Sequence, residues 1–526
     1  MRDERSEDDL RLVVVSNRGP FEHHLRPDNR IEVRRASGGL VTALSAFRKH
    51  NDFHWIACAV TAGDRRAVRE TVRRRDSQTT SQHLSGSLEP DSPARSNDPF
   101  LHTTELVAVP ENVFRKYYEV FSNRALWFLQ HSMWDRLDTP KDKTTVSDAW
   151  WAGYVPTNLA LARTAAARAR KLRSRVLMLH DYHLYLTPGY IRQRLPDVVL
   201  QHFIHIPWPE PKGWEPLPLP MLREICRGLL SNDIIGFQTS ASVCNFLRSC
   251  DAWLDDAEVD YTRNTVQLRG RIVRVRAYPI SIDVAGLRRA MDLPVFRQHQ
   301  EHLRRLCGDR TIVRVDRLDP SKNIALGFRA FEQLLIERPE LRGKVKFLAF
   351  LVPSRTGVRE YVQCREEIAS LVNAINDRYS VGEHRPIEIF YENNYYQALA
   401  GMSLCDVLLV NPLADGMNLV AKEGPIVSTR DSVLVLSRKA GAFAQLAGGA
   451  LAVDPKDIGG TARALVQALE MSPDERRERA RFLRGRIENE GIFHWVTRQL
   501  DDIHVILSES SEPSRKLARF QDFARA

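Results

Sequence analysis

The sequence has few cysteines and no long hydrophobic segment. Its 7 cysteines are scattered over 526 residues, and none of them form a Cys-x-x-Cys pair. Such a pattern indicates free thiols in a reducing compartment and argues against a disulfide framework or a cysteine zinc site. No apolar run approaches the roughly 20 residues that span a bilayer, and the charged N-terminus lacks the pattern of a signal peptide. We therefore expect a cytoplasmic protein with no membrane partner.

Two common nucleotide-binding fingerprints are absent as well. The chain contains neither the Gly-x-Gly-x-x-Gly pattern nor a Walker loop. Its net charge of +10 suits nucleic acid, small phosphorylated ligands, or simply a solvated arginine-rich surface. The basic clusters at 65–75 and 477–486 are not interleaved with aromatic residues in the way that single-strand-binding proteins are. We expect no nucleic-acid partner.

Short apolar runs rich in β-branched residues, such as "LRLVVVSN", "RVLMLH" and "DVLLVN", alternate with segments of helical periodicity. This alternation predicts the α/β class, with parallel sheets covered by helices on both faces. Because the chain is too long for one core, we predict two doubly wound Rossmann-like domains, at residues 1–285 and 286–485. We expect 486–526 to be a helical segment that packs back on the first domain, and the polar stretch 76–99 to be a flexible loop.

Ligands of open α/β sheets bind at the carboxyl ends of the strands, so residues at those ends are the first candidates. Arg18 directly follows the run "VVVSN". Gly38 and Gly39 precede a helical stretch, where glycine lets backbone N–H groups approach a phosphate. An ordinary turn is the alternative interpretation of this Gly-Gly pair.

Two further strand ends in the first half carry an aspartate and histidines. In "VLMLHDYHL", Asp181 could bind a substrate hydroxyl or cap the following helix. His180 and His183 have no third ligand at helical spacing, so we expect no metal. In "HFIHIPWP", an odd offset places His202 and His205 on opposite faces. We favour His205, which is nearest the proline break, as a neutral donor to a sugar hydroxyl or a main-chain carbonyl.

Cations follow two strands of the second half. In "VRVDRLDPSKN", Arg317 and Lys322 lie at a strand end and a helix start, which suits a diphosphate. The alternative is a surface Arg317 paired with Asp316 or Asp319. Arg355 in "FLVPSRTGV" follows another strand.

Two aromatic residues of the first half are also candidates for the site. Tyr118 and Trp127 in "KYYEVFSNRALW" lie at helical spacing. They could line a site or belong to the core.

The stretch "DVLLVNPLADGMNLVAKEG" reads as strand, loop and helix. Asp415 can accept from sugar hydroxyls, and Gly416 permits an unusual backbone turn. Glu423, one or two helical turns later, could bind a ribose diol. The helix start would offer the unpaired backbone N–H groups of Met417, Asn418, Leu419 and Val420. This mixture suits a sugar joined to a nucleotide through a diphosphate.

Nine short motifs together resemble the trehalose-6-phosphate synthases, retaining glycosyltransferases of the GT-B fold. They are "VVVSNR", "SGGL", "YYEVFSNRALW", "HDYHL", "HIPWP", "GFQT", "DRLDPSKN", "VPSR" and "DGMNLVAKE", in the family order between about residues 12 and 500. The resemblance implies two Rossmann-like domains with a cleft between them. It implies glucose transfer from a nucleotide-glucose to glucose 6-phosphate, with no metal and no cofactor.

The resemblance also implies roles for individual residues. The acceptor-binding set is Arg18, Tyr118, Trp127, Asp181 and Arg355. The donor-binding set is Gly38, Gly39, His205, Arg317, Lys322, Asp415, Gly416, Met417, Asn418, Leu419, Val420 and Glu423. The catalytic set, which positions substrates and stabilises charge, is Asp181, His205, Arg317, Lys322 and Asp415.

Two segments depart from the family pattern. Members often have "DYSKG" or "DYTKG" where this chain has "DPSKN", and "KEYVA" where it has "KEGPIV". Both segments flank the donor site, so UDP-glucose and GDP-glucose both stay open as donors. A glycerol 3-phosphate or cyclitol phosphate acceptor, C–N coupling by a pseudo-glycosyltransferase, and a non-catalytic sugar-phosphate sensor are the alternative functions. The oligomeric state is open, with a homo-oligomer among the possibilities.

Overall fold

The computed structural model describes residues 11–35, 44, 53–78, 103–137, 143–355 and 357–523. Gly38 and Gly39 lie outside these ranges, and so does most of the expected loop at 76–99. The first three residues of that stretch belong to helix α2 (Ala62–Gln78) instead. Within the described ranges, no helix combines the length and the hydropathy that crossing a bilayer requires.

The first half of the chain builds a sheet with the strand order β5-β4-β1-β6-β7-β8-β11-β10-β9. The strands from β5 to β11 in this order are parallel, and β10 runs antiparallel to both β11 and the edge strand β9. The bounds are β1 (Leu12–Ser16), β4 (Phe53–Cys58), β5 (Thr104–Val107), β6 (Val176–His180), β7 (Val199–Ile204), β8 (Ile234–Phe237), β9 (Ala257–Asp260), β10 (Thr265–Leu268) and β11 (Arg271–Ala277). Strands β1, β6 and β7 are buried along their whole length, as parallel strands covered on both faces must be.

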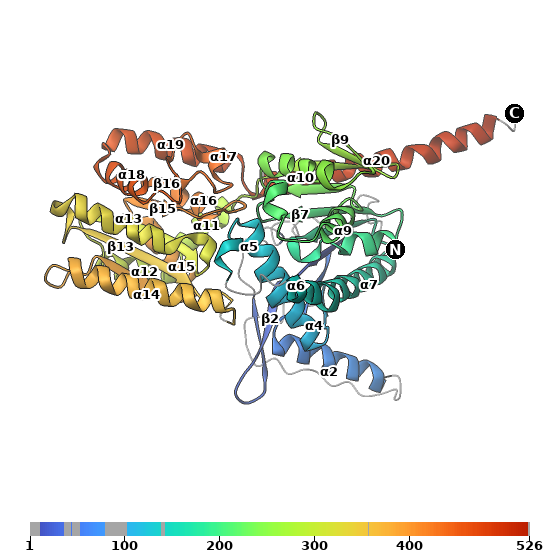
Figure 1. Cartoon of the computed structure of the whole chain (residues 1–526), viewed down its shortest axis with the longest axis horizontal. Coiled ribbons are helices and arrows are strands. Elements are labelled where there is room, and N and C mark those ends of the chain that lie inside the picture. The colour runs from blue at the N-terminus through green and yellow to red at the C-terminus, as the bar shows by residue number, and fades with distance from the viewer. Residues whose placement is uncertain are drawn as a thin grey trace, which may run out of the picture.

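Helices cover this sheet, and one hairpin extends away from it. The helical segments are α4 (Glu111–Arg115), η1 (Lys116–Leu126), α5 (Trp127–Gln130), η2 (Trp134–Arg136), α6 (Lys143–Ala149), η3 (Trp150–Tyr154), α7 (Val155–Leu172), η4 (Tyr182–Leu184), α8 (Thr187–Arg192), η5 (Pro211–Trp214), α9 (Leu219–Leu229) and α10 (Ser240–Trp253). Strands β2 (Phe21–Leu25) and β3 (Ile31–Arg35) pair antiparallel and project from the body in Figure 1.

The second half builds a parallel sheet with the order β14-β13-β12-β15-β16-β17. Its strands are β12 (Arg310–Arg317), β13 (Val345–Val352), β14 (Ile387–Phe390), β15 (Val407–Val410), β16 (Val433–Ser437) and β17 (Leu451–Val453). Its helical segments are α11 (Val284–Asp292), α12 (Pro294–Arg304), η6 (Pro320–Lys322), α13 (Ile324–Glu337), η7 (Pro339–Leu341), α14 (Arg359–Tyr379), α15 (Tyr395–Leu404), α16 (Val420–Val427), α17 (Phe443–Leu446), α18 (Ile458–Glu470) and α19 (Pro473–Asn489). The prediction of two parallel α/β sheets is confirmed.

The chain returns to the first sheet through helix α20 (Ile492–Phe523). Trp495 Nε1 donates to the backbone oxygen of Tyr278 (3.1 Å), and Gln201 Nε2 donates to Gln499 Oε1 (2.7 Å). The Trp495 ring also packs edge-on against Phe203 of β7 (5.2 Å). Figure 1 shows α20 passing the first sheet and then extending beyond it. The domain limits at 285 and 485 stay predictions.

Candidate active site

Side chains from the two sheets meet around Arg355, just after strand β13. Arg355 Nη2 donates to Tyr182 Oη (3.2 Å), although 173 residues separate them in sequence. Its guanidinium lies 3.9 Å from the centre of the Trp127 ring, a cation–π contact. Arg355 has a φ of +45°, a conformation that is uncommon for non-glycine residues and concentrates at functional sites. The predicted acceptor residues Arg355 and Trp127 therefore lie together.

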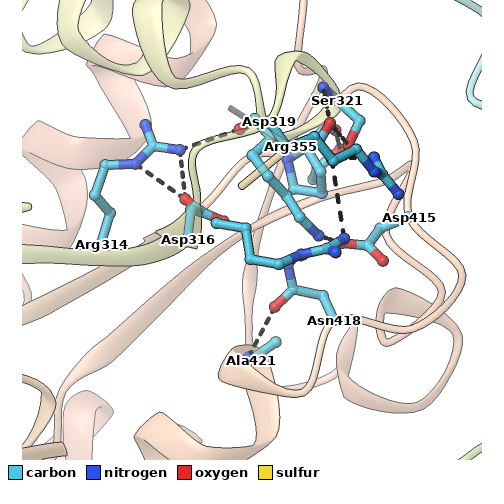
Figure 2. Close-up of polar contacts among 12 residues, drawn as sticks. Arg314, Asp316, Asp319, Ser321, Arg355, Asp415, Asn418 and Ala421 are labelled. Atoms are coloured by element: carbon cyan, nitrogen blue, oxygen red, sulfur yellow. Dashed lines mark hydrogen bonds and ion pairs between the residues drawn. The ribbon is translucent and has the colours of Figure 1, made fainter. Parts of the chain in front are cut away.

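Asp319 and Tyr361 hold the Arg355 guanidinium in place. Arg355 Nη1 donates to Asp319 Oδ2 (3.1 Å) and to the Tyr361 hydroxyl. Asp319 also accepts from Tyr361 Oη (3.0 Å) and from the backbone N–H and hydroxyl of Ser321 (2.9 and 2.8 Å). Burial opposes ionisation of Asp319, but Arg355 and Arg317 hold its pKa well below the usual range. Figure 2 shows Asp319, Ser321 and Arg355 gathered at this point.

A second arginine reaches the same region from the end of β1. Arg18 Nη2 donates to Tyr118 Oη (3.1 Å), and Arg18 Nη1 pairs with Glu22 (2.9 Å). The Tyr118 ring stacks on Phe114 (5.2 Å). Burial raises the pKa of Tyr118, but the charges of Arg18 and Arg355 outweigh it and lower that pKa. The predicted acceptor residues thus include two guanidinium groups that act on one phenol. Trp127 belongs to the buried core, as the alternative interpretation held, and Tyr118 is partly buried against that core; both rings also contact these cations.

Asp181 follows β6 with a φ of +76° and does not cap the helical turn after it. Its Oδ1 instead accepts from the backbone N–H of His205 (3.3 Å). Burial raises the pKa of Asp181 to about 6. The capping alternative is therefore wrong, and the carboxyl group links the ends of β6 and β7.

His205 lies just past the end of β7 and is partly exposed. Burial of its ring lowers its pKa to about 3, so the imidazole is neutral near pH 7. Its Nε2 lies 3.3 Å from His180 Nδ1. His202, the candidate that the offset argument set aside, bonds through Nε2 to the backbone oxygen of Asp181 (3.0 Å).

Lys322 and Asp415 form an ion pair that joins η6 to the loop after β15. Asn418 Nδ2 donates to the same carboxylate oxygen of Asp415 (3.1 Å). Although burial opposes it, the charge of Lys322 lowers the pKa of Asp415. Figure 2 draws Asp415 and Asn418 in one view with Arg355 and Asp319, and the charge of Arg317 helps to lower the pKa of both Asp319 and Asp415. These donor candidates therefore lie together.

The side chain of Arg317 lies near Asp319 and Trp127. Its side chain is 46% exposed, lies 3.9 Å from Asp319 Oδ2, and has its guanidinium 5.4 Å from the Trp127 ring centre. Asp316 pairs instead with the buried Arg314 (2.7 Å), which also donates to the backbone oxygen of Lys322. The alternative pairing of Arg317 with Asp316 is therefore wrong, and its pairing with Asp319 is a loose contact.

Gly416 is required for close approach and not for a positive φ. A Cβ at this position would lie 1.8 Å from the backbone oxygen of His205. The positive φ in this loop belongs to Asn418, at +76°. Helix α16 begins at Val420, later than the expected start at Met417, with Leu419 at its N-cap position. Within the described ranges, the backbone N–H groups of Met417, Asn418 and Leu419 donate to no protein acceptor.

Glu423 lies in the first turn of α16. Burial raises the pKa of its carboxyl group to about 7. Burial, and after it the nearby charge of Glu423, raises the pKa of Tyr395 at the start of α15. Near pH 7 this carboxyl group is therefore partly ionised, and its ionised form can accept hydrogen bonds from ligand hydroxyl groups.

Sequence reasoning missed Asp319, Tyr361 and Tyr182 as contacts of Arg355. Asp319 and Tyr182 stand inside the quoted motifs "DRLDPSKN" and "HDYHL", next to residues that were chosen. Tyr361 lies in a plain helical pattern and gave no signal. Gly38 and Gly39 lie outside the described residues. In the part of the chain that the structure covers, no cluster of three metal-ligating side chains is present.

Residues 10–505 match the family model described as Glycosyltransferase family 20. A bifunctional trehalose-6-phosphate synthase/phosphatase of Thermoproteus tenax is 33% identical over 521 residues, which cover 98% of this chain and 66% of that protein. The chain thus spans just under two thirds of the length of this relative. A trehalose-6-phosphate synthase of Mycobacterium avium is 32% identical over 508 residues, covering 93% of this chain and 94% of that protein.

Solved structures agree with the sequence relatives. An α,α-trehalose-phosphate synthase (UDP-forming) of Burkholderia xenovorans, in complex with glucose 6-phosphate, has a TM-score of 0.74 at 28% identity and covers 94% of this chain and 100% of its own. A protein of E. coli bound with UDP-2-fluoro glucose has a TM-score of 0.74 at 26% identity, and the match covers 94% of this chain and 98% of that protein's chain. The two-sheet fold is the GT-B fold, as predicted. The chain belongs to glycosyltransferase family 20 and is a homologue of trehalose-6-phosphate synthases.

Proposed function

We propose that this protein transfers glucose from UDP-glucose or GDP-glucose to glucose 6-phosphate and forms α,α-trehalose 6-phosphate with retention of configuration. The observation that carries the proposal is the meeting of Arg355, from the second sheet, with Tyr182 and Trp127 of the first. The relative from Burkholderia xenovorans binds glucose 6-phosphate, which supports the choice of acceptor.

The acceptor phosphate is bound by Arg18 and Arg355. Both guanidinium groups act on Tyr118, so two positive charges are available where one dianion would bind. Charge-assisted hydrogen bonds from arginine are well suited to phosphate. Trp127 supplies a face for the sugar ring, and Asp181 accepts from a hydroxyl group. Its pKa of about 6 leaves this carboxyl group mostly ionised at neutral pH.

The donor diphosphate is bound by Lys322 and Arg317 together with the backbone N–H groups of 417–419. Free N–H groups at a helix start favour an anion. Asp415 binds a glucose hydroxyl next to the lysine that it pairs with. Glu423 binds the ribose diol. The E. coli protein bound with UDP-2-fluoro glucose supports a nucleotide-sugar donor.

The reaction forms the bond between the anomeric carbon of the donor glucose and the anomeric oxygen of glucose 6-phosphate. The bond from that carbon to the diphosphate oxygen breaks, and the acceptor proton passes to the departing diphosphate. Asp415 is held by Lys322 and Asn418, and Asp181 by the backbone of His205. The family resemblance assigns neither carboxylate the role of nucleophile, so we propose that attack occurs on the face that the diphosphate leaves. The protein contributes positioning and charge stabilisation, and no cofactor takes part.

One assay tests this proposal. The purified protein is given glucose 6-phosphate with UDP-, GDP- and ADP-glucose in parallel, and the product is identified by mass and by the couplings of its anomeric protons. An α,α-linked disaccharide phosphate supports the proposal. Transfer only to glycerol 3-phosphate or a cyclitol phosphate would identify a sister enzyme. Donor binding without any nucleotide release would identify a sensor.

A further inference from the structure

His180 contacts the ring of His205 where two neighbouring strands end. The register of β6 and β7 pairs His180 with Phe203, two residues before His205. His180 Nδ1 lies 3.3 Å from His205 Nε2, and the ring centres are 5.5 Å apart. Because His180 is fully buried, one ring nitrogen of His205 is tied to the protein interior.

Both rings are neutral at physiological pH. Burial lowers the pKa of His205 to about 3 and that of His180 well below its usual value. Each neutral imidazole carries one N–H, so the contact is an N–H···N hydrogen bond with one ring as donor. The nitrogen of His180 that carries the proton therefore decides which nitrogen of His205 carries one.

The far nitrogen of His180 favours one direction for this bond. Within the described ranges, His180 Nε2 is buried and has no hydrogen-bond partner. If His205 donated, the proton of His180 would lie on that nitrogen as a buried N–H without an acceptor. If His180 donates, the nitrogen is bare, and unsatisfied buried acceptors are less rare in proteins than unsatisfied buried N–H groups.

His202 of strand β7 also carries its proton on one ring nitrogen and leaves the other ring nitrogen buried without a partner among the described residues. Its Nε2 lies 3.0 Å from the backbone oxygen of Asp181 and must therefore carry the proton. Its Nδ1 is then a bare, buried nitrogen without a partner in the described part of the chain. A bare nitrogen on a buried histidine is thus already tolerated next to the site.

We propose that His180 is a positioning residue that donates through Nδ1–H to His205 Nε2 and so fixes the proton of His205 on Nδ1. In the described structure, no protein atom is hydrogen-bonded to His205 Nδ1, and His205 is partly exposed. If the proposed function holds, the Nδ1–H group of His205 donates a hydrogen bond to an oxygen of the donor glucose. The other tautomer would present only a lone pair there.

The backbone of His205 is fixed independently of its ring. Asp181 accepts from its N–H, and Gly416 approaches its carbonyl oxygen so closely that no Cβ would fit. The ring of Phe203 packs edge-on against the imidazole (4.6 Å). These contacts set the place of the ring and leave the position of its proton to His180.

The direct test is the tautomer of His205 in the full-length protein labelled with ¹⁵N-histidine. The ¹⁵N shifts and N–H couplings near pH 7 show which ring nitrogen is protonated, and the variant His205→Asn assigns the signal. We expect the proton on Nδ1. A proton on Nε2 would overturn the inference. No substrate is needed, so the result stands even if the assay finds no glucosyl transfer and the proposed function fails.

Two replacements of His180 connect the tautomer to activity. In His180→Asn an amide N–H takes the place of the Nδ1–H donor, whereas His180→Leu removes the donor. We expect His180→Leu to lower kcat about tenfold, the size of one net hydrogen bond, and to mix the His205 tautomers. His180→Asn should restore kcat and the Nδ1–H tautomer. Equal kcat values for the two variants would contradict the inference.

The control is His202→Leu, which removes another buried imidazole from the same pair of strands. Its ring contacts the backbone of Asp181 and not the ring of His205. We expect the His205 tautomer to be unchanged in this variant. A tautomer change here would mean that any buried histidine nearby acts as His180 does, and the specific role would be lost.

Discussion

The ammonium group of Lys322 is ion-paired with the carboxylate of Asp415, 93 residues further along the chain. Asn418 donates to the same carboxylate. Lys322 is thereby held against the loop in which, among the described residues, the backbone N–H groups of 417–419 donate to no protein acceptor. If a diphosphate binds here, as we propose, a lysine and backbone donors already lie together to receive it.

Replacing Lys322 or Arg317 by alanine should lower kcat about a hundredfold or more, since a lost donor to developing charge costs about 3–4 kcal/mol of barrier. Lys322→Ala should be the more severe change, because it leaves the partly buried Asp415 without its counter-ion. Steady-state kinetics with saturating donor measure the effect. Arg329→Ala, an exposed arginine of helix α13, is the control. Rates near wild type in both site variants would remove these cations from the mechanism.

Tyr361→Phe should weaken acceptor binding and leave donor binding intact. The hydroxyl group of Tyr361 bonds both Arg355 and Asp319, so its loss frees the guanidinium to move. We expect KM for glucose 6-phosphate to rise about tenfold, the worth of one hydrogen bond to a charged group. Tyr379→Phe, at the other end of the same helix α14, is the matched control. An unchanged KM would show that Asp319 alone positions Arg355.

Affinity for the donor should rise with pH until about pH 7 and then level off. The carboxyl group of Glu423 has a raised pKa of about 7, so below that value it is mostly protonated. A ribose diol donates to the carboxylate, so binding favours the ionised form, which accumulates as pH increases. Calorimetry of nucleotide-glucose binding without acceptor, between pH 5.5 and 8.5, measures this dependence. The variant Glu423→Gln should show a flat profile over the same range, and a slope that survived it would assign the titration to another group.

Gly416→Ala should abolish donor turnover, because the added Cβ would overlap the backbone oxygen of His205. The loop that carries Asp415 and the free N–H groups would have to move away from β7. Gly485→Ala is the contrasting variant, since its Cβ would meet no atom within 4 Å in helix α19. That change should raise the free energy of unfolding by about 1 kcal/mol. Chemical denaturation and turnover together check the pair, and a fully active Gly416→Ala would refute the close approach.

The sheets could be predicted from sequence because buried parallel strands are nearly continuous apolar runs. Strands β1, β6 and β15 correspond to the runs "VVVS", "VLMLH" and "VLLV", and residues that follow each strand lie in the candidate site. The β2–β3 hairpin was not predicted, because its strands are polar and only partly buried. Tyr361 could not be chosen either, since helical spacing does not reveal that Arg355 folds back upon it. Glycine is needed at 416 because this loop packs against the backbone of His205, which is distant in sequence. A local sequence pattern cannot reveal such a contact.

The most direct measurement is a crystal structure with a nucleotide-glucose and glucose 6-phosphate bound together. The account predicts the diphosphate between Lys322, Arg317 and the backbone N–H groups of 417–419, and the sugar phosphate between Arg18 and Arg355. A diphosphate bound away from Lys322 and that loop would contradict it.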